Sequence, residues 1–274
     1  MTREFRLLGD PVAHSLSPAI HRAAFEAWGV ADTYRLERVE AGGLERAVRE
    51  AAERGGGNVT LPHKEAVAKL LDRRSRHVTS TGACNCFWRT ADGELAGDNT
   101  DVEGFVAAAR DLGAEVSGGR VLVLGAGGAA RAVIRGLQLM GARRIELWNR
   151  TEGRARRLST ELSGELDVLE RRPTDGRYDL VVNATRLGLA DTDPLPLDLS
   201  GGLADAALDL VYGRGPDGTA WTRHATRHGV DAADGAGMLV HQAALSLARW
   251  FPGREPPLTT MLAAVRGGSG DASP

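Results

Sequence analysis

Residues 121–130 read Val-Leu-Val-Leu-Gly-Ala-Gly-Gly-Ala-Ala, and they indicate the fold class more strongly than any other stretch. Val121–Leu124 is an apolar run of the kind found in strands buried within a parallel sheet. The glycine-rich turn leads into a predicted helix at Arg131–Met140. Gly125 permits a tight turn, Gly127 lets the backbone approach a pyrophosphate, and Ala130 is the accepted variant of the third glycine. A purely structural turn is the alternative, but the strand before it and the helix after it favour a dinucleotide-binding domain.

The residues after the next predicted strand, Arg144–Trp148, indicate which dinucleotide is bound. Domains that bind NAD usually end this strand with an acidic residue for the ribose 2′-hydroxyl. Here the strand is followed by Asn149-Arg150-Thr151, with Arg154 one turn later. Guanidinium groups engage phosphate through paired donors, so we predict NADP(H) as the cofactor. The alternative is that Arg150 is one more arginine in an arginine-rich chain.

Strand-like and helix-like patterns alternate along the whole chain, which predicts an α/β fold. Asn85–Arg89 and Glu94–Gly97 resemble a hairpin around the turn pair Asp92-Gly93. The other predicted strands are Phe5–Leu8, Tyr34–Val39, Gly57–Leu61, Leu180–Asn183 and Ala207–Val211. The other predicted helices are Pro18–Trp28, Leu44–Arg54, His63–Leu71 and Val102–Leu112, and Arg154–Arg157 is expected on a solvated helix face.

The composition is that of an ordinary globular protein large enough for two modest domains. The chain has 274 residues, a formal net charge of −2, 42% hydrophobic and 26% charged residues. This charge gives no electrostatic signature for nucleic acid or an anionic membrane, and no apolar run approaches a membrane span. The only cysteines, Cys84 and Cys86, are too close together for a disulfide framework, which favours a reducing cytoplasm. The tail from Gly267 to Pro274 is expected to be disordered.

Lys64 is a candidate acid or base because lysine is rare in this chain. Only two of its 34 cationic side chains are lysines, Lys64 and Lys69. Guanidinium stays protonated in proteins, whereas a desolvated ammonium can release a proton near neutral pH. The alternative is that codon bias explains the arginines and that Lys64 is a leftover surface charge.

Polar clusters fall at four predicted turns before the nucleotide-binding domain. Ser15 and Ser17 either cap the helix that starts at Pro18 or bind a carboxylate at its N-terminus. The other clusters contain Thr60 with Lys64, Asn85, and Asp101, and the last of these is also a candidate helix cap.

Taken together, these clusters resemble the shikimate dehydrogenase family. The matching stretches cover nearly the whole chain in family order: GDPVAHSLSP (9–18), NVTLPHK (58–64), GACN (82–85), GDNTDVEG (97–104), GAGGAARA (125–132), NRTEGRA (149–155), NATRLG (183–188), DLVY (209–212) and GMLVHQAA (237–244). The resemblance implies reduction of 3-dehydroshikimate to shikimate by NADPH, in aromatic amino acid biosynthesis.

The resemblance also assigns roles to residues. It implies that Lys64 and Asp101 form the catalytic pair. It implies substrate binding by Ser15, Ser17, Thr60, Lys64, Asn85, Asp101, Tyr212 and Gln242. It implies NADP(H) binding by Gly125, Ala126, Gly127, Gly128, Ala129, Asn149, Arg150, Thr151, Arg154, Thr185, Leu210, Gly235 and Met238. A hydride-reduced ketone needs a proton donor at its oxygen, which suits the pair of Lys64 and Asp101.

The expected architecture has two domains with the active site in the cleft between them. Residues 1–101 and 237–274 form the substrate domain, residues 102–236 the NADP-binding Rossmann domain, and the crossings at 101/102 and 236/237 act as hinges. A monomer and a homodimer are both compatible with the sequence, and no metal site is expected. Cys84 and Cys86 are a weak zinc signal, and His224 and His228 are expected to be exposed.

Some residues depart from the family pattern, and two other functions remain open. Cys86 stands where the family usually has Thr, Arg76 lies where many members have an acid, and Arg186 replaces a common Ser. The alternatives are a dehydrogenase for quinate or an amino-substituted analogue, and a catalytically silent NADP-binding sensor. Intact Lys64 and Asp101 speak against the sensor.

Overall fold

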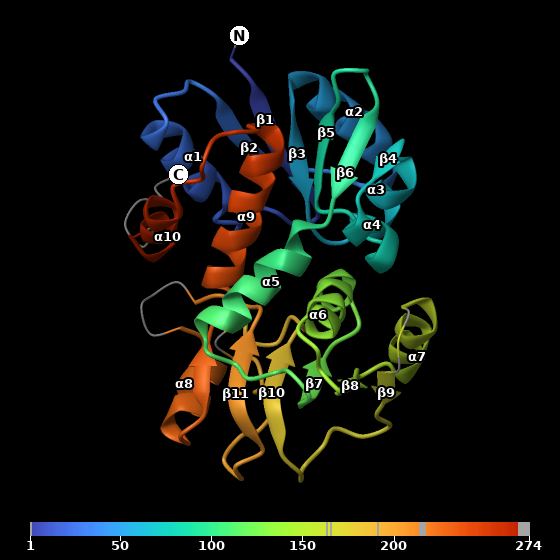
Figure 1. Ribbon diagram of the computed structural model, residues 1–274, viewed down its shortest axis with the longest axis vertical. Coiled ribbons are helices and arrows are strands. Elements are labelled where there is room, and N and C mark those ends of the chain that lie inside the picture. Colours follow the sequence, from blue (N-terminus) through green and yellow to red (C-terminus); the bar gives the residue numbers. More distant parts are fainter. Residues whose placement is uncertain (1, 163, 165, 191, 214–217, 268–274) are drawn as a thin grey trace. The chain divides into compact units, whose positions relative to one another are not determined.

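The computed structural model describes residues 2–267 except 163, 165, 191 and 214–217, and it divides into two compact units. One unit comprises residues 1–101 and 239–274, and the other comprises residues 102–238. Each contains a sheet covered by helices, which confirms the predicted α/β class (Figure 1). The tail predicted to be disordered starts at Gly267, but Gly267 is the last residue of a helix, and residues 268–274 lie outside the described part of the chain.

The first unit contains a six-stranded sheet, the helices that connect its strands, and one helix near the C-terminus. Its elements are β1 (Glu4–Gly9), α1 (Ser17–Ala27), β2 (Thr33–Arg38), the 3₁₀ turn η1 (Ala41–Gly43), α2 (Leu44–Arg54), β3 (Gly55–Val59), α3 (Lys64–Leu70), β4 (Arg73–Arg74), α4 (Arg76–Thr81), β5 (Cys86–Arg89), β6 (Leu95–Asp98) and α10 (Leu258–Gly267). Two helices, α5 (Thr100–Asp111) and α9 (Ala236–Trp250), contain residues of both units.

The sheet of the first unit brings three chain segments to one edge. Its strand order is β2-β1-β3-β5-β6-β4. β5 is antiparallel both to β3 and to β6, so β6 runs in the same direction as β3. The carboxyl ends of β3 and β6 and the amino end of β5 therefore lie at the same edge. Buried apolar side chains on the face covered by α2, among them Leu8, Val48, Val59 and Phe87, form one hydrophobic cluster of this unit.

The second unit has six parallel strands in the order of a doubly wound nucleotide-binding fold. Its elements are β7 (Arg120–Leu124), α6 (Gly128–Leu139), β8 (Arg144–Trp148), α7 (Glu152–Glu161), β9 (Leu166–Val168), β10 (Tyr178–Asn183), β11 (Ala204–Asp209), α8 (Ala220–Arg227) and β12 (Asp231–Ala233). The order β9-β8-β7-β10-β11-β12 reverses direction between β7 and β10. In such sheets the ligand binds at the carboxyl ends of the strands, beside this reversal.

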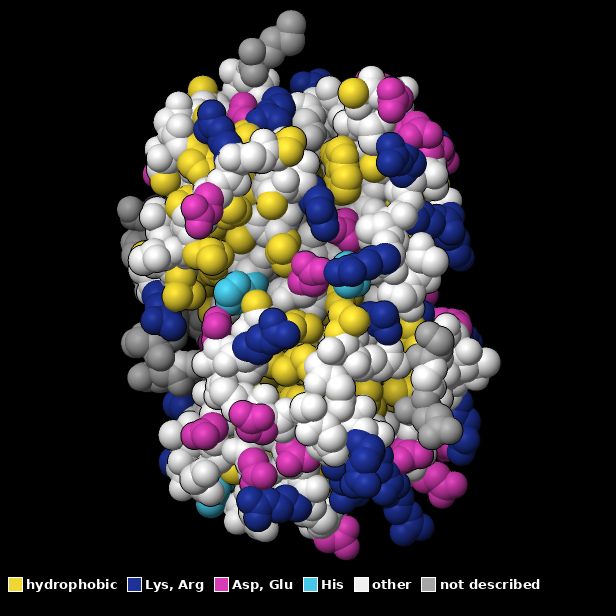
Figure 2. Space-filling model, viewed as in Figure 1, with side chains coloured by type: hydrophobic (Ala, Val, Ile, Leu, Met, Phe, Trp, Pro, Cys, Tyr) yellow, Lys and Arg dark blue, Asp and Glu magenta, His cyan; other side chains and the backbone are white. Residues whose placement is uncertain are grey.

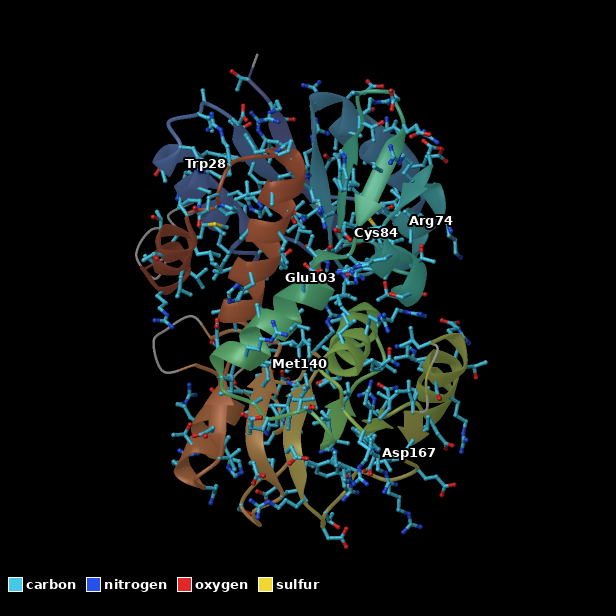
Figure 3. All side chains as sticks on the ribbon, viewed as in Figure 1. Trp28, Arg74, Cys84, Glu103, Met140 and Asp167 are labelled. Atoms are coloured by element: carbon cyan, nitrogen blue, oxygen red, sulfur yellow. The ribbon has the colours of Figure 1, made fainter. Side chains whose placement is uncertain are left out.

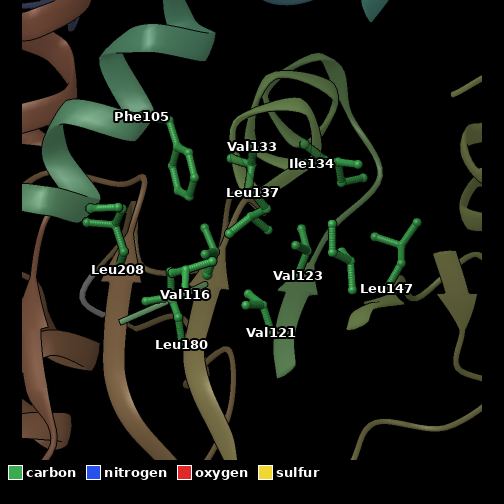
Figure 4. Packing of buried hydrophobic residues seen from close by; sticks show 14 of the residues in the cluster. Phe105, Val116, Val121, Val123, Val133, Ile134, Leu137, Leu147, Leu180 and Leu208 are labelled. Atoms are coloured by element: carbon green, nitrogen blue, oxygen red, sulfur yellow. The ribbon is translucent and has the colours of Figure 1, made fainter. Parts of the chain in front are cut away.

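One of the two apolar clusters of the second unit lies between the sheet and helices α5 and α6, and the other lies on the face of the sheet that α8 covers. Figure 4 shows Val133, Ile134 and Leu137 of α6 with Val121 and Val123 of β7 in one apolar cluster. The helical period of α6 places these three side chains on one face, and β7 turns Val121 and Val123 toward them and Leu122 and Leu124 to the other face of the sheet, so both faces of β7 are buried. This packing fixes the N-terminus of α6 at the carboxyl end of β7.

Several predicted boundaries were displaced. The strand predicted at Gly57–Leu61 is Gly55–Val59, and the one predicted at Ala207–Val211 is Ala204–Asp209. The helix predicted to start at Arg131 starts at Gly128, because the glycine turn closes within three residues. In the described part of the chain no helix combines the length and apolar character needed to span a bilayer. Figure 2 shows cationic and anionic side chains interspersed over one face, as the small net charge implies.

Candidate active site

Lys64 and Asp101 form an ion pair at the shared edge of the first sheet. Lys64 is the first residue of α3, just after β3, and Asp101 is the second residue of α5, just after β6. The Lys64 Nζ lies 2.5 Å from Asp101 Oδ2, and the two side chains are only 13% and 7% exposed. A pair this shielded from water interacts more strongly than a surface salt bridge. The alternative of a leftover surface charge at Lys64 is therefore wrong.

Asn85 holds the second oxygen of Asp101. Its Nδ2 donates to Asp101 Oδ1 at 2.8 Å and lies 3.3 Å from Oε1 of Gln242. Its Oδ1 accepts a hydrogen bond from the backbone N–H of Thr100 at 2.7 Å. Asn85 precedes β5, so the sheet edge supplies all three segments. The side chain of Asp101 makes these bonds and does not cap α5, which corrects the expectation of a cap.

Thr60 and the two N-terminal serines lie in turns of the same unit. Thr60 follows β3, and its backbone N–H donates to Leu8 O at 2.9 Å. The Ser15 Oγ donates to Ser17 Oγ at 3.1 Å and accepts from the Ser17 N–H at 3.2 Å. Neither hydroxyl caps α1, whose N-cap is Leu16, so the capping alternative is wrong. Within the described residues, the serines make no hydrogen bond to Lys64 or Asp101.

The sequence did not predict a buried series of hydrogen bonds that connects polar side chains of this unit. The Asn58 Nδ2 donates to Ser246 Oγ at 2.9 Å, and Ser246 Oγ lies 3.3 Å from Thr100 Oγ1. Tyr34 OH donates to Asn58 Oδ1 at 2.8 Å, and burial raises the pKa of this phenol. One signal was available, because Ser246 follows Gln242 by four residues and so shares its helix face. This series of hydrogen bonds holds Thr100 in one position, and Thr100 in turn holds Asn85.

The glycine turn of the second unit leaves room for a ligand at the start of α6. Gly125 has φ +109°, and a Cβ there would lie 2.8 Å from Ala184 O. Gly127 is the N-cap of α6, and a Cβ there would meet no atom within 4 Å in the described structure. The helix N-terminus offers free N–H groups and a positive dipole end, which suit a pyrophosphate. This space and these donors fit a bound dinucleotide, with Ala126, Gly128 and Ala129 completing the turn.

The segment after β8 presents polar and cationic groups. Asn149 Nδ2 donates to Thr151 O at 2.8 Å, and Thr151 precedes α7. Arg150 and Arg154 are exposed, and in the part of the chain that the structure describes neither forms an ion pair. These guanidinium groups are therefore available to an anion, and a 2′-phosphate is the one that NADP(H) carries.

A buried carboxylate, Asp209, joins the ends of β10 and β11. Its Oδ1 accepts from Asn183 Nδ2 at 2.7 Å and from the Val211 N–H at 3.0 Å, and its Oδ2 accepts from Thr219 Oγ1 at 2.7 Å. Burial raises the pKa of Asp209 to about 6, against the lowering effect of these hydrogen bonds. Sequence analysis gave Asp209 and Asn183 no role of their own, although each is a polar residue closing an apolar strand.

Two of the remaining predicted cofactor residues form hydrogen bonds with Asn183 of this network. Thr185 Oγ1 donates to Asn183 Oδ1 at 2.7 Å, and the Leu210 N–H donates to Asn183 O at 2.9 Å. A side chain at Gly235 would collide with the carbonyl group of Leu210. Met238 is buried in the apolar core of its unit, and Tyr212 is partly buried.

Other candidates have structural explanations. His224 is not exposed as expected, because Nε2 accepts from the Leu199 N–H at 3.2 Å and lies 3.0 Å from Asp198 Oδ1; His228 is exposed. Cys84, which is labelled in Figure 3, and Cys86 are fully buried, and burial raises the pKa of both thiols, to about 12 for Cys84. Arg76 and Arg186 are exposed. Among the described residues, no group of three or more His, Cys, Asp or Glu side chains is arranged to hold a metal ion.

Comparisons with known proteins show the family to which the chain belongs. Three family models match: shikimate dehydrogenase substrate binding domain at residues 7–87, shikimate/quinate 5-dehydrogenase at 107–187, and shikimate 5′-dehydrogenase C-terminal domain at 235–266. The chain is 42% identical to a shikimate dehydrogenase (NADP(+)) of Alkalilimnicola ehrlichii, over 97% of this chain and 99% of that protein. It is 41% identical to the Methylobacterium radiotolerans enzyme of the same name, over 93% of each chain.

A solved structure extends the likeness to three dimensions. The shikimate 5-dehydrogenase of Thermus thermophilus, in complex with NADP(H) and shikimate, superposes with a TM-score of 0.81 at 36% identity, over 97% of this chain and 98% of that one. Agreement of this extent covers both units. The chain belongs to the shikimate dehydrogenase family.

Proposed function

We propose that this protein is an NADP-dependent oxidoreductase that reduces 3-dehydroshikimate reversibly to shikimate, in the shikimate pathway of the cytoplasm. The observation that carries the reaction is the shielded Lys64–Asp101 pair, set beside the amides of Asn85 and Gln242. The cofactor assignment is supported by the space at Gly127 and by Arg150 and Arg154, which form no ion pair within the described residues. Family membership supports both parts.

Lys64 supplies the proton in the proposed mechanism. Bound NADPH provides the hydride that forms the new C–H bond at the ketone carbon. Negative charge then develops on the ketone oxygen, and the Lys64 ammonium stabilises that charge and transfers a proton to form the hydroxyl. In the reverse direction the neutral amine accepts the proton of the same hydroxyl. Asp101 orients the amine, and Asn85 in turn holds Asp101.

The polar groups around the pair explain the choice of a hydroxylated substrate. Thr60, Asn85 and Gln242 offer hydroxyl and amide groups, and Ser15 and Ser17 offer two linked hydroxyls for a carboxylate. A site that pairs each substrate hydroxyl rejects analogues that lack one, because its own polar groups would be left unsatisfied. This favours a polyhydroxylated ring acid as the substrate.

The first test measures turnover with each pairing of cofactor and substrate. We expect loss of reduced cofactor absorbance with NADPH and 3-dehydroshikimate, much slower turnover with NADH, and reverse oxidation of shikimate. Faster oxidation of quinate or an amino-substituted analogue than of shikimate would replace the proposed substrate. Folded protein that binds NADPH but turns over none of these substrates would favour the sensor.

The second test concerns Lys64 itself. Lys64→Met keeps the length of the side chain but removes its proton, so kcat should fall by roughly 10²–10⁴-fold while KM changes much less. Lys69→Met is the matched control, because Lys69 is the other lysine, lies in the same helix α3 and is exposed. An effect of Lys64→Met on KM alone would remove Lys64 from the chemistry.

A further inference from the structure

Arginines near the amino ends of β8 and β9 form ion pairs, whereas three described arginines after the carboxyl ends of these strands do not. At the amino ends, Arg144 Nε lies 3.0 Å from Glu146 Oε1 and 2.6 Å from Asp167 Oδ2, a residue labelled on β9 in Figure 3. Arg120 Nε lies 2.7 Å from the same Glu146 oxygen. Acidic partners from the protein therefore neutralise the cations at this end.

After the carboxyl ends, three described arginines lack such partners. Arg150 and Arg154 follow β8, Arg172 follows β9, and all three are exposed. Over the described residues, none of them forms an ion pair. Glu152 is already paired with Arg156, and Glu170, which precedes Arg171, forms no ion pair with these arginines in the described structure. Exposed guanidinium groups without an acidic partner remain available to bind an anion.

The pairing of β8 with β9 places the Arg172 segment beside the end of β8. Leu147 pairs with Val168, and the Leu169 N–H donates to Leu147 O at 2.9 Å. The chain from Leu169 onward thus leaves the sheet next to Trp148, the last residue of β8. Trp148 directly precedes Asn149 and Arg150, the residues already assigned to the cofactor.

Trp148 holds the Arg172 guanidinium at this point. The Arg172 Cζ lies 4.4 Å from the centroid of the Trp148 ring system, and the indole packs against the apolar cluster that contains Leu122 and Leu124. A guanidinium stacked on an aromatic ring uses its flat face, so its N–H donors at the edge stay available. In the described structure those donors have no protein acceptor.

We propose that Arg172, positioned by Trp148, is a further binding residue for the 2′-phosphate of NADP(H), together with Arg150 and Arg154. The inference rests on the proposed function and deepens its cofactor site. The ribose of a dinucleotide lies over the end of the strand that β8 represents, and its 2′-substituent points toward the residues after that strand. A phosphate dianion there meets donors from the segments after both β8 and β9.

Binding of adenosine fragments tests this residue without any turnover. Titration calorimetry with 2′,5′-ADP and with 5′-ADP would compare the wild type with Arg172→Gln. We expect Arg172→Gln to weaken 2′,5′-ADP roughly tenfold, the effect of one charge-assisted contact, and to leave 5′-ADP unchanged. Arg172→Lys keeps the charge but loses the paired donors and the flat face, so it should recover part of the loss.

The matched control is Arg171→Gln. Arg171 is exposed and adjacent in sequence, and in the described structure it makes no cation–π contact with Trp148, so its replacement should leave both affinities unchanged. Equal effects of the Arg171 and Arg172 variants, or an equal loss of 5′-ADP, would overturn the inference, as would failure of the wild type to bind 2′,5′-ADP. Wild-type protein that shows the expected pattern but does not turn over shikimate would remove only the proposed reaction.

Discussion

At the scale of single residues, His21 is a base that the fold keeps neutral. It is fully buried in α1, stacks on Tyr34 with 4.0 Å between ring centroids, and its Nδ1 lies 2.8 Å from Ser17 O. Because a carbonyl oxygen only accepts, Nδ1 carries the hydrogen. The other nitrogen, Nε2, finds no partner among the described residues. Burial lowers the pKa of His21 to about 4, since a charged imidazole there would lose its hydration.

His21 makes the protein less stable in mild acid. Between pH 6.5 and about 4 the unfolded chain takes up a proton on this histidine and the folded chain does not, so stability falls as the pH falls. From neutral pH to about pH 5 this loss is about 2 kcal/mol. Urea unfolding of the wild type and of His21→Phe at both pH values measures it. The variant keeps the stacked ring and should lose less stability than the wild type; an equal loss would contradict the assignment.

At the scale of secondary structure elements, the β7–α6 turn separates a structural glycine from one that leaves room for a ligand. Gly125 has φ +109° and lies close to Ala184 O, so its constraint comes from the protein itself. Gly127 has φ −104°, which any residue adopts, and open space where a Cβ would stand. The absence of a side chain at Gly127 thus leaves room for a ligand at the N-terminus of α6.

Alanine substitutions at Gly127 and Gly125 should differ in their effect on thermal stability. Gly127→Ala should leave Tm within a few degrees of the wild type but raise the Kd for NADPH at least about tenfold, because its methyl group occupies the approach to the pyrophosphate. Gly125→Ala should lower Tm as well, through backbone strain and a clash. Thermal melts and fluorescence titration with NADPH separate the two effects. Unchanged NADPH affinity in Gly127→Ala would argue against a pyrophosphate at this position.

At the scale of the whole molecule, two buried groups in different units make opposite contributions to the pH dependence of stability, His21 in the first unit and Asp209 in the second. Burial raises the pKa of Asp209, in the second unit, to about 6. As the pH falls from about 6 toward 4, the folded protein therefore takes up a proton that the unfolded chain does not, and the free energy of unfolding rises. In the first unit, the lowered pKa of His21 makes the free energy of unfolding fall over the same pH range. The Arg6 guanidinium lowers the pKa of Glu4, which acts in the same direction as His21.

The first unit should therefore open first in mild acid. Hydrogen exchange followed by peptide mass spectrometry, corrected for the intrinsic effect of pH, should show β1 and β3 losing protection between neutral pH and about pH 5 more than β10 and β11. His21→Phe should reduce this difference. Equal losses in both sheets, or a larger loss in β10 and β11, would contradict it.

The sequence predicted elements well where apolar periodicity was strong and failed where pairing decides. Helix α2 at Leu44–Arg54 and strand β8 at Arg144–Trp148 have the predicted bounds. Strand β3 begins at Gly55, earlier than predicted, because three successive glycines carry no strand signal and only pairing with β1 and β5 makes them a strand. The two-residue β4 and the three-residue β9 and β12 were missed for the same reason, since edge pairing alone defines them.

Local patterns and short motifs in order were enough to establish the α/β class, the nucleotide-binding turn and the family. Which polar groups meet depends instead on how the chain folds in space. Asn58 and Ser246 are 188 positions apart, Asp209 gathers donors from two strand ends and a helix, and Trp148 meets Arg172 because β8 pairs with β9. The physical reason is that hydrogen bonds and charges act over a few ångströms in space, whatever the distance along the chain.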